Sequence, residues 1–205
     1  MSDELEAIEP MTTLDRAQPG SPASPFAAWR TRDILLAAIV GVVFGVVFFV
    51  WNGFYNGLGW MAPPWADVVY GMWLVPPILA PLLIRKPGAA LFAELTAAGV
   101  SVMLGSPWGP DTLLSGFVQG AAAELIFAFT GYRAWSVVVL AVAAVASAAG
   151  AWIHDWTIYY ADFAVDIQLL RLAIMAVSAV VFAAFGSLAI ERSIRKSGVL
   201  GDPEA

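Results

Sequence analysis

The sequence predicts an all-α integral membrane protein with about six transmembrane helices and both termini in the cytoplasm. Of the 205 residues, 60% are hydrophobic and only 13% are charged, whereas soluble domains average about 25% charged residues. The mean hydropathy is +0.77. A chain of this length cannot bury so much apolar surface inside a soluble core, so we expect lipid to cover much of it.

A helix needs about 20 mostly apolar residues to cross the hydrocarbon core of a bilayer. Six stretches approach or reach that length, and we expect helices over roughly 32–51, 68–85, 88–104, 112–131, 133–152 and 168–191. The "RKPG" segment contains a Pro-Gly pair, which is typical of a turn and separates the second stretch from the third. The stretches are continuously apolar and do not alternate, which argues against a strand barrel.

The two ends of the chain differ from the part between them. Residues 1–28 are acidic, rich in Pro, Ser and Ala, and without hydrophobic periodicity, so we expect a disordered cytoplasmic tail. They do not look like a signal peptide, because no basic segment precedes a short apolar run. We therefore expect one transmembrane domain over 29–196 and a second short cytoplasmic tail over 197–205.

The positive charges predict the orientation of the helices. Every second connection carries Lys or Arg, namely Arg30, Arg32, Arg85, Lys86, Arg133, Arg192, Arg195 and Lys196. The connections around 52–67, 105–111 and 153–167 contain neither residue. Because positive residues remain on the cytoplasmic side, this alternation predicts that both termini are cytoplasmic in the cell membrane.

The predicted outer side is rich in aspartate and in large aromatic residues. The aspartates are Asp67, Asp111, Asp155, Asp162 and Asp166, and the aromatics are Trp60, Trp65, Trp108, Trp156, Tyr159 and Tyr160. An interfacial belt accounts for part of the aromatic set. The remainder predicts a binding surface, and carboxylates without basic partners favour a cation or a neutral polar solute over an anion.

Several function classes lack support in the sequence. There is no cysteine and only one histidine, so we expect no disulfide, no metal site and no cofactor. No basic cluster indicates a nucleic-acid partner, and no constellation resembles a nucleophile triad, so we do not expect an enzyme. A Walker A motif is also absent, so ATP-driven transport would need an ATPase on another chain.

Two glutamates lie within predicted membrane spans. Glu94 and Glu124 occupy neighbouring helices that run in opposite directions, and both reach similar depths somewhat nearer the cytosol. Ionisable residues at such depth mark functional sites or polar contacts between helices. We expect Glu124 to contact a ligand, with Glu94 as a second contact. Gln119 lies nearer the outside and is a further candidate for either role.

The end of the first span predicts an aromatic pocket. Trp51, Asn52, Tyr55 and Asn56 share helical spacing if the helix continues that far. Asparagine beside Trp or Tyr is typical of a pocket for a flat heterocycle, with a stacking face and hydrogen-bonding edges. Trp73, deeper in the second span, is expected to face the same cavity. The alternative is an interfacial belt followed by a glycine-rich loop.

Three further features have both structural and functional interpretations. His154 and Asp155 can form a hydrogen-bonded pair in the loop after the fifth span. Arg171 is expected to pair with Asp166, Asp162, Glu94 or Glu124. Ala37, Gly41 and Gly45 form a small-residue stripe at four-residue intervals, which either packs inside the chain or docks another membrane subunit.

The strings "LIRKPGAALFAEL" (83–95) and "LGSPWGPDTLLSGFVQGAAAELIFAFTGYR" (104–133) resemble a known family. Together with the six-span pattern, they are similar to the substrate-binding S components of energy-coupling-factor (ECF) vitamin transporters, in the YkoE-type hydroxymethylpyrimidine/thiamine branch. The resemblance covers roughly residues 30–196. It places Trp108, Gln119, Glu94 and Glu124 in matching strings, and it implies that Ala37, Gly41 and Gly45 dock the coupling subunit.

The resemblance implies a subunit that captures thiamine or its hydroxymethylpyrimidine precursor from the outside. It would then associate with a transmembrane coupling subunit and two cytoplasmic ATPase subunits in the bilayer. Other vitamins, such as cobalamin or a riboflavin-like solute, remain open as substrates. A structural or assembly membrane protein is an alternative from another class. An intramembrane enzyme is the least favoured interpretation, because the sequence shows no catalytic constellation.

Overall fold

The computed structural model describes residues 26, 28–59, 61 and 64–198 of the chain. Most of the tail predicted over 1–28, the aromatic residue Trp60 and most of the tail predicted over 197–205 lie outside these described residues. Within the described part every regular element is helical. The elements are α1 (Thr31–Gly57), η1 (Trp65–Leu74), α2 (Pro76–Ile84), α3 (Ala89–Met103), α4 (Asp111–Phe129), α5 (Val137–Ile158), α6 (Val165–Ala179), η2 (Val180–Phe185) and α7 (Gly186–Lys196).

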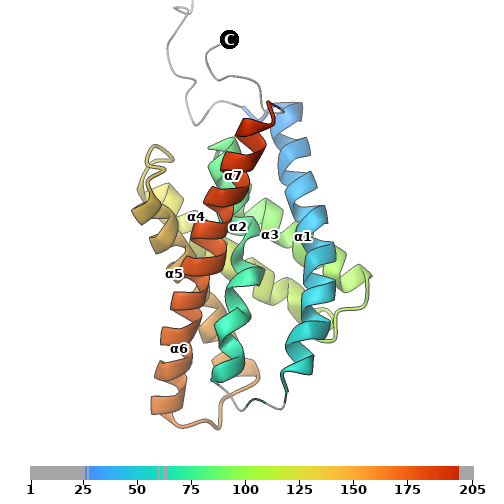
Figure 1. Ribbon diagram of the computed structural model, residues 1–205, viewed down its shortest axis with the longest axis vertical. Helices are drawn as coiled ribbons and strands as arrows, with labels where there is room; N and C mark the ends of the chain where they lie inside the picture. Colours follow the sequence, from blue (N-terminus) through green and yellow to red (C-terminus); the bar gives the residue numbers. More distant parts are fainter. Residues whose placement is uncertain (1–25, 27, 60, 62–63, 199–205) are drawn as a thin grey trace, which may run out of the picture.

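The predicted all-α membrane class is confirmed. Five helical stretches in the described residues are long and apolar enough to span a bilayer, and α3 is a shorter apolar helix. Figure 1 shows an elongated bundle in which the start of α1 and the end of α7 lie at the same end. The side of the membrane on which this end of the bundle lies remains a prediction from the positive charges.

The helices pack in a chain of neighbours around a central element. α1 packs on α3, α3 on α4, α4 on α5, and α5 on α6, while α6 also contacts η1. The short helix α2 contacts most of the others, and its residues are almost all buried. The second predicted span is therefore the inner element of the bundle and has little contact with lipid.

That second span is divided in two by its prolines. Residues Trp65–Leu74 form a 3₁₀ helix, and an α-helix then begins with Pro76 and Pro77 at its first two positions. Proline is accepted there because the first turn needs no N–H donor and the ring presets φ. The change in helix type at Val75 brings the side chains of Tyr70 and Trp73 to one end of the bundle interior.

Two helices extend further than the apolar stretches predicted. α1 continues to Gly57 instead of ending near residue 51, and α5 continues to Ile158 instead of residue 152. At 1.5 Å per residue, the 27 residues of α1 span about 40 Å. The extensions matter for function because Asn52, Tyr55, His154 and Asp155 are thereby held on rigid helices, whereas His154 and Asp155 were expected in a loop.

The small-residue stripe on α1 packs against α3 inside the chain, which is one of its two interpretations. Docking of a coupling subunit through this stripe stays a prediction. A Cβ atom at Gly41 would lie 2.5 Å from Thr96 Cβ, and one at Gly45 would lie 2.4 Å from Val100 Cβ, both on α3. Ala37 is fully buried. The glycines are needed because the α1 and α3 backbones approach closely at these positions.

Candidate functional site

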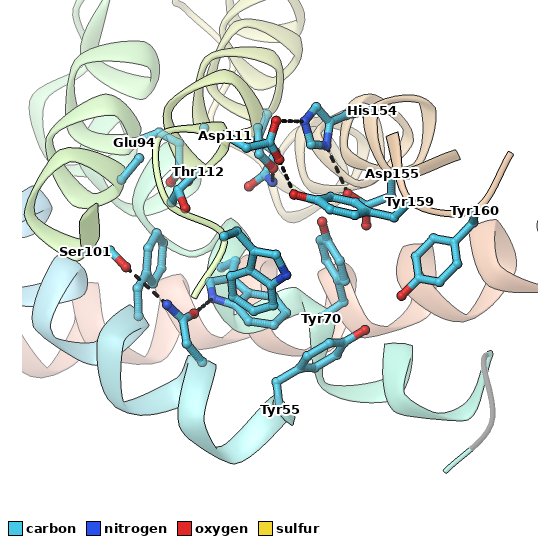
Figure 2. Close-up of a pocket in the computed structure, with 18 residues that line it drawn as sticks. Tyr55, Tyr70, Glu94, Ser101, Asp111, Thr112, His154, Asp155, Tyr159 and Tyr160 are labelled. Carbon is cyan, nitrogen blue, oxygen red and sulfur yellow. Dashed lines mark hydrogen bonds and ion pairs between the residues drawn. The ribbon is translucent and has the colours of Figure 1, made fainter. Parts of the chain in front are cut away.

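A cavity of about 350 Å³ lies in the half of the bundle away from the start of α1 and the end of α7. Its lining comes from α1, η1, α3, α4, α5 and the segments after α3 and α5. The lining residues are Phe48, Asn52, Tyr55, Tyr70, Trp73, Glu94, Ala98, Ser101, Trp108, Asp111, Thr112, Ser115, Gly116, Gln119, His154, Asp155, Tyr159 and Tyr160. Figure 2 shows how these side chains converge.

Aromatic rings form one wall of the cavity. The Trp73 ring lies at the centre, with centroid distances of 4.9 Å to Tyr55, 5.1 Å to Tyr70 and 5.8 Å to Trp108, all in edge-to-face geometry. Tilted and edge-to-face contacts hold large rings in fixed orientations. The prediction that Tyr55, Trp73 and Trp108 meet around one pocket is supported by this geometry, and Tyr70 completes the wall.

Asn52 holds this aromatic wall in place, and both ends of its side-chain amide are hydrogen-bonded to other residues of the chain. Its amide nitrogen donates to Ser101 Oγ at 3.2 Å, and its amide oxygen accepts from Trp73 Nε1 at 3.0 Å. The side chain is 2% exposed. Because both ends of the amide already have partners, Asn52 links α1, α3 and η1 and holds the Trp73 ring in place.

Glu94 lines the cavity, and one of its carboxyl oxygens has no hydrogen-bond partner among the described residues. The residue is 1% exposed, and its Oε2 atom has no hydrogen-bond partner among the described residues. The backbone of α4 passes close by, since a Cβ at Gly120 would lie 3.1 Å from Glu94 Cβ. Gln119 on the same helix donates to Ser115 Oγ at 2.6 Å. A buried acceptor without a donor is costly, so this position suits a donor-bearing ligand.

Glu124 was expected to be the polar anchor of the pocket, and the structure places it elsewhere. Its carboxylate accepts backbone hydrogen bonds from Gly88 at 2.6 Å, Ala90 at 2.9 Å and Leu91 at 3.4 Å, and one from the Tyr132 hydroxyl at 2.7 Å. The first N–H groups of a helix have no partners within the helix and carry partial positive charge. Glu124 therefore caps α3 and does not line the cavity.

Trp51 also lies outside the cavity, in contrast to the prediction. Its indole nitrogen donates to the backbone oxygen of Val69 at 3.2 Å, and its ring contacts Phe54 and Phe182. It lies one residue before Asn52 on α1, and neighbouring helical positions point about 100° apart. The face that turns Asn52 inward therefore turns Trp51 toward η1 and η2.

A buried ion network supports the exposed end of the cavity. The Arg171 side chain is fully buried and pairs with Asp67 through Nε at 2.8 Å, while one of its terminal nitrogens lies 3.6 Å from Asp155. Its guanidinium also lies 3.8 Å from the centre of the Tyr160 ring. The partners expected for Arg171 were Asp162, Asp166, Glu94 or Glu124. None of these is its partner here, because the break at Val75 brings η1 and Asp67 against α6.

His154 joins two carboxylates at the same end. Its Nδ1 lies 3.0 Å from Asp155 Oδ1, as the predicted pair requires, and its Nε2 lies 3.2 Å from Asp111 Oδ1. The Tyr159 hydroxyl donates to the other Asp111 oxygen. Burial and the neighbouring Asp111 carboxylate raise the pKa of Tyr159, which keeps its hydroxyl protonated as a donor. These contacts tie α4 to the end of α5.

Several residues that line the pocket, among them Asp111 and Ser115, were not predicted from the sequence, although their spacing along the chain is regular. Each helix contributes positions three or four apart, namely Phe48, Asn52 and Tyr55 on α1, Glu94, Ala98 and Ser101 on α3, and Asp111, Ser115 and Gln119 on α4. Such spacing places side chains on one helical face. A search for polar residues at this spacing, joined to the acidic and aromatic outer side, would have included Asp111 and Ser115.

Comparisons with known proteins agree with this architecture. Residues 32–150 match the protein family described as "ABC-type cobalt transport system, permease component". The chain is 35% identical over 175 residues to the "Putative HMP/thiamine permease protein YkoE" of Bacillus subtilis, which covers 84% of this chain and 88% of that protein. A solved structure described as "Crystal structure of an S-component of ECF transporter" superimposes with a TM-score of 0.82 and 34% identity, covering 84% of this chain and 89% of the other.

The helical membrane fold and its cavity thus define a membrane-embedded transport subunit of the S-component class. Sequence identity of more than 30% over most of both chains narrows the assignment from this class to one family. The chain belongs to the YkoE-type family of ECF transporter S components.

Proposed function

We propose that this protein captures thiamine or its hydroxymethylpyrimidine moiety in the cavity and delivers it to an ATP-driven ECF importer. The observation that carries the proposal is the unmet Oε2 atom of Glu94 beside an aromatic wall. The relative from B. subtilis is named as an HMP/thiamine permease. In this role the chain is a binding subunit and performs no catalysis itself.

The chemistry of an aminopyrimidine fits the two parts of the cavity. Its amino group offers N–H donors, and Glu94 supplies a buried acceptor that no group in the described part of the chain uses. The flat ring matches the faces and edges presented by Tyr55, Trp73 and Trp108. Leaving a buried polar group without a hydrogen bond costs about 1–3 kcal/mol, so this contact favours one orientation of the ring.

The size and character of the cavity favour this substrate over the alternatives. A volume of about 350 Å³ is near the lower limit of small-molecule sites, which span about 300–1,000 Å³. That favours a compact two-ring vitamin over a corrinoid. A cobalt ion is also less suitable, since no three His, Asp or Glu side chains in the described part of the chain converge as metal ligands.

The transport role requires partners and an orientation. We propose that a transmembrane coupling subunit and two cytoplasmic ATPase subunits associate with this chain in the cell membrane. The positive-charge pattern supports cytoplasmic termini, which would open the cavity toward the outside. The stripe on α1 packs on α3, so we propose that partner contacts also use other lipid-facing surfaces.

Calorimetric titration of the detergent-solubilised protein tests the proposal. Thiamine and hydroxymethylpyrimidine are titrated into the wild type and into Glu94→Gln. We expect both compounds to bind the wild type, and we expect the variant to bind each about ten- to a hundredfold more weakly because glutamine replaces one carboxylate oxygen with an NH₂ group, which cannot accept the ligand's hydrogen bond. Absence of binding to the wild type would contradict the proposed substrate class, and unchanged affinity in the variant would remove Glu94 from the site.

A further inference from the structure

The end of the bundle that holds the start of α1 and the end of α7 (Figure 1) carries an excess of positive charge. Within the described part of the chain, eight basic side chains and three carboxylates belong to this end, so their formal charges sum to 8 − 3 = +5. The basic residues are Arg30, Arg32, Arg85, Lys86, Arg133, Arg192, Arg195 and Lys196, and the acidic ones are Asp33, Glu124 and Glu191.

Two of these arginines form an exposed patch without acidic partners. Arg85 ends α2, Arg133 lies in the turn after α4, and both side chains are exposed. The Arg85 guanidinium lies 5.8 Å from the centre of the Trp135 ring, two residues beyond Arg133. Neither arginine has an ion pair with a described carboxylate, whereas Lys86 pairs with Asp33 at 2.7 Å. We call Arg85, Arg133 and Trp135 the arginine patch, and its uncompensated charge attracts anions.

The residues just before α1 lie against the same two turns. The Phe26 ring packs edge-to-face on Tyr132, with the ring centres 6.1 Å apart, and Tyr132 immediately precedes Arg133. Trp29 donates from Nε1 to the backbone oxygen of Pro87 at 3.0 Å, in the turn that follows Arg85. These contacts fix the first described residue of the chain beside the arginine patch, so any segment that precedes it is tethered there.

The sequence that precedes Phe26 carries the opposite charge. Residues 1–25 lie outside the described part of the chain, and they contain five acidic residues and one basic residue, which gives 1 − 5 = −4. These residues are Asp3, Glu4, Glu6, Glu9, Asp15 and Arg16. We propose that this acidic segment binds the arginine patch of its own chain. The inference concerns the end of the bundle away from the cavity and does not depend on the substrate.

Reach and tethering make this contact feasible. Asp15 lies 11 residues before Phe26, and a chain of that length spans at most about 36–40 Å, so the patch is within range. Single ion pairs between exposed groups are weak. A tethered segment, however, acts at an effective concentration of about millimolar, and several pairs act together. Salt weakens the contact, because the screening length falls from about 10 Å at 0.1 M to about 3 Å at 1 M.

The docked segment covers a surface that otherwise attracts anionic lipid head groups, since exposed arginines beside a membrane bind such lipids. The acidic segment has the advantage over lipid of being covalently attached next to Arg133. Anionic lipids and acidic segments of other proteins must therefore displace it before they reach the arginine patch.

Distances between spin labels in the full chain test the proposal, because the chain has no native cysteine. One pair, Thr12→Cys with Val137→Cys, joins the acidic segment to the exposed first residue of α5, two residues beyond Trp135. The control pair, Thr12→Cys with Ala161→Cys, joins it to the other end of the bundle. At about 0.1 M salt we expect a narrow distance population for the first pair and a broad one for the control. At about 1 M salt the narrow population should broaden.

Two variants in the acidic segment isolate its charge without altering the helical bundle. Glu9→Gln with Asp15→Asn removes two charges, and we expect the narrow population to fall at least about twofold. Glu9→Asp with Asp15→Glu keeps both charges and is the matched control, in which the population should stay unchanged. On the other side of the contact, Arg85→Gln with Arg133→Gln should also remove the population.

Several results would overturn the inference. A broad distribution for the first pair at low salt means that the segment is not docked. Equal populations in the charge-removing and charge-keeping variants mean that charge does not hold it. The same measurement in vesicles of neutral phosphatidylcholine addresses the alternative occupant. We expect the narrow population there, and its absence would leave the patch to anionic lipids. None of these results bears on ligand binding in the cavity, so the proposed function stands or fails separately.

Discussion

Exchange of Glu124 for glutamine separates the role of this residue as a helix cap from the role of a ligand contact. The carboxylate accepts four hydrogen bonds, three of them from backbone N–H groups at the start of α3. In Glu124→Gln one oxygen becomes an NH₂ group. In the least costly arrangement the NH₂ group replaces the oxygen that faces Gly88 and Tyr132. The Tyr132 oxygen can then accept a hydrogen bond from the NH₂ group, but the N–H of Gly88 loses its acceptor.

The expected loss follows from these contacts. An orphaned donor costs about 1–3 kcal/mol, and the remaining bonds lose the charge that complements the helix dipole, at about 0.3–1 kcal/mol. The side chain is only half-buried, so we expect a total near 2 kcal/mol. For a chain of 150–250 residues, 1 kcal/mol shifts Tm by about 2–4 °C. The Tm should therefore fall by about 4–8 °C.

The measurement is thermal unfolding in detergent without ligand, combined with titration of thiamine. Glu94→Gln is the matched control, because it makes the same substitution in another membrane helix. Glu94 Oε2 has no hydrogen-bond partner among the described residues. The Tm of Glu94→Gln should therefore stay within about 1 °C, while its affinity for thiamine falls. Glu124→Gln should show the opposite pattern, with affinity within about twofold. Unchanged Tm together with weakened binding in Glu124→Gln would refute the capping role.

Two further outcomes are expected. Gly41→Leu should lower Tm by several degrees and weaken binding by the isolated chain, because its Cβ would lie 2.5 Å from Thr96 Cβ and overpacking costs about 1–3 kcal/mol. Gly53→Leu is the control, because no described residue lies within 4 Å of a Cβ at that position. Loss of uptake without loss of stability in Gly41→Leu would instead indicate a partner contact. Ala161→Cys, in a chain that has no native cysteine, should react with a membrane-impermeant maleimide in intact cells, and reaction only after lysis would reverse the orientation.

The sequence by itself determined the class of the protein and the approximate position of each membrane segment. Hydrophobicity and length are local properties, so long apolar stretches reveal spanning helices before any contact is known. The same local chemistry indicated the acidic and aromatic character of one side, where the cavity opens, and the pairing of His154 with Asp155. Asn52, Tyr55 and Trp73 were also recognised, because helical spacing is readable from the chain.

Only the tertiary structure decided which polar residues face the cavity. Glu94 and Glu124 both lie in Ala-Glu-Leu strings within apolar helices, so their local sequences do not distinguish them. The rotation of α4 turns Glu124 toward the first turn of α3, and the rotation of α3 turns Glu94 into the cavity. The packing of Gly41 inside the chain likewise depends on Thr96, a neighbour that is distant in sequence. Helix rotation and pairing are set by contacts between distant segments, and no window along the chain contains them.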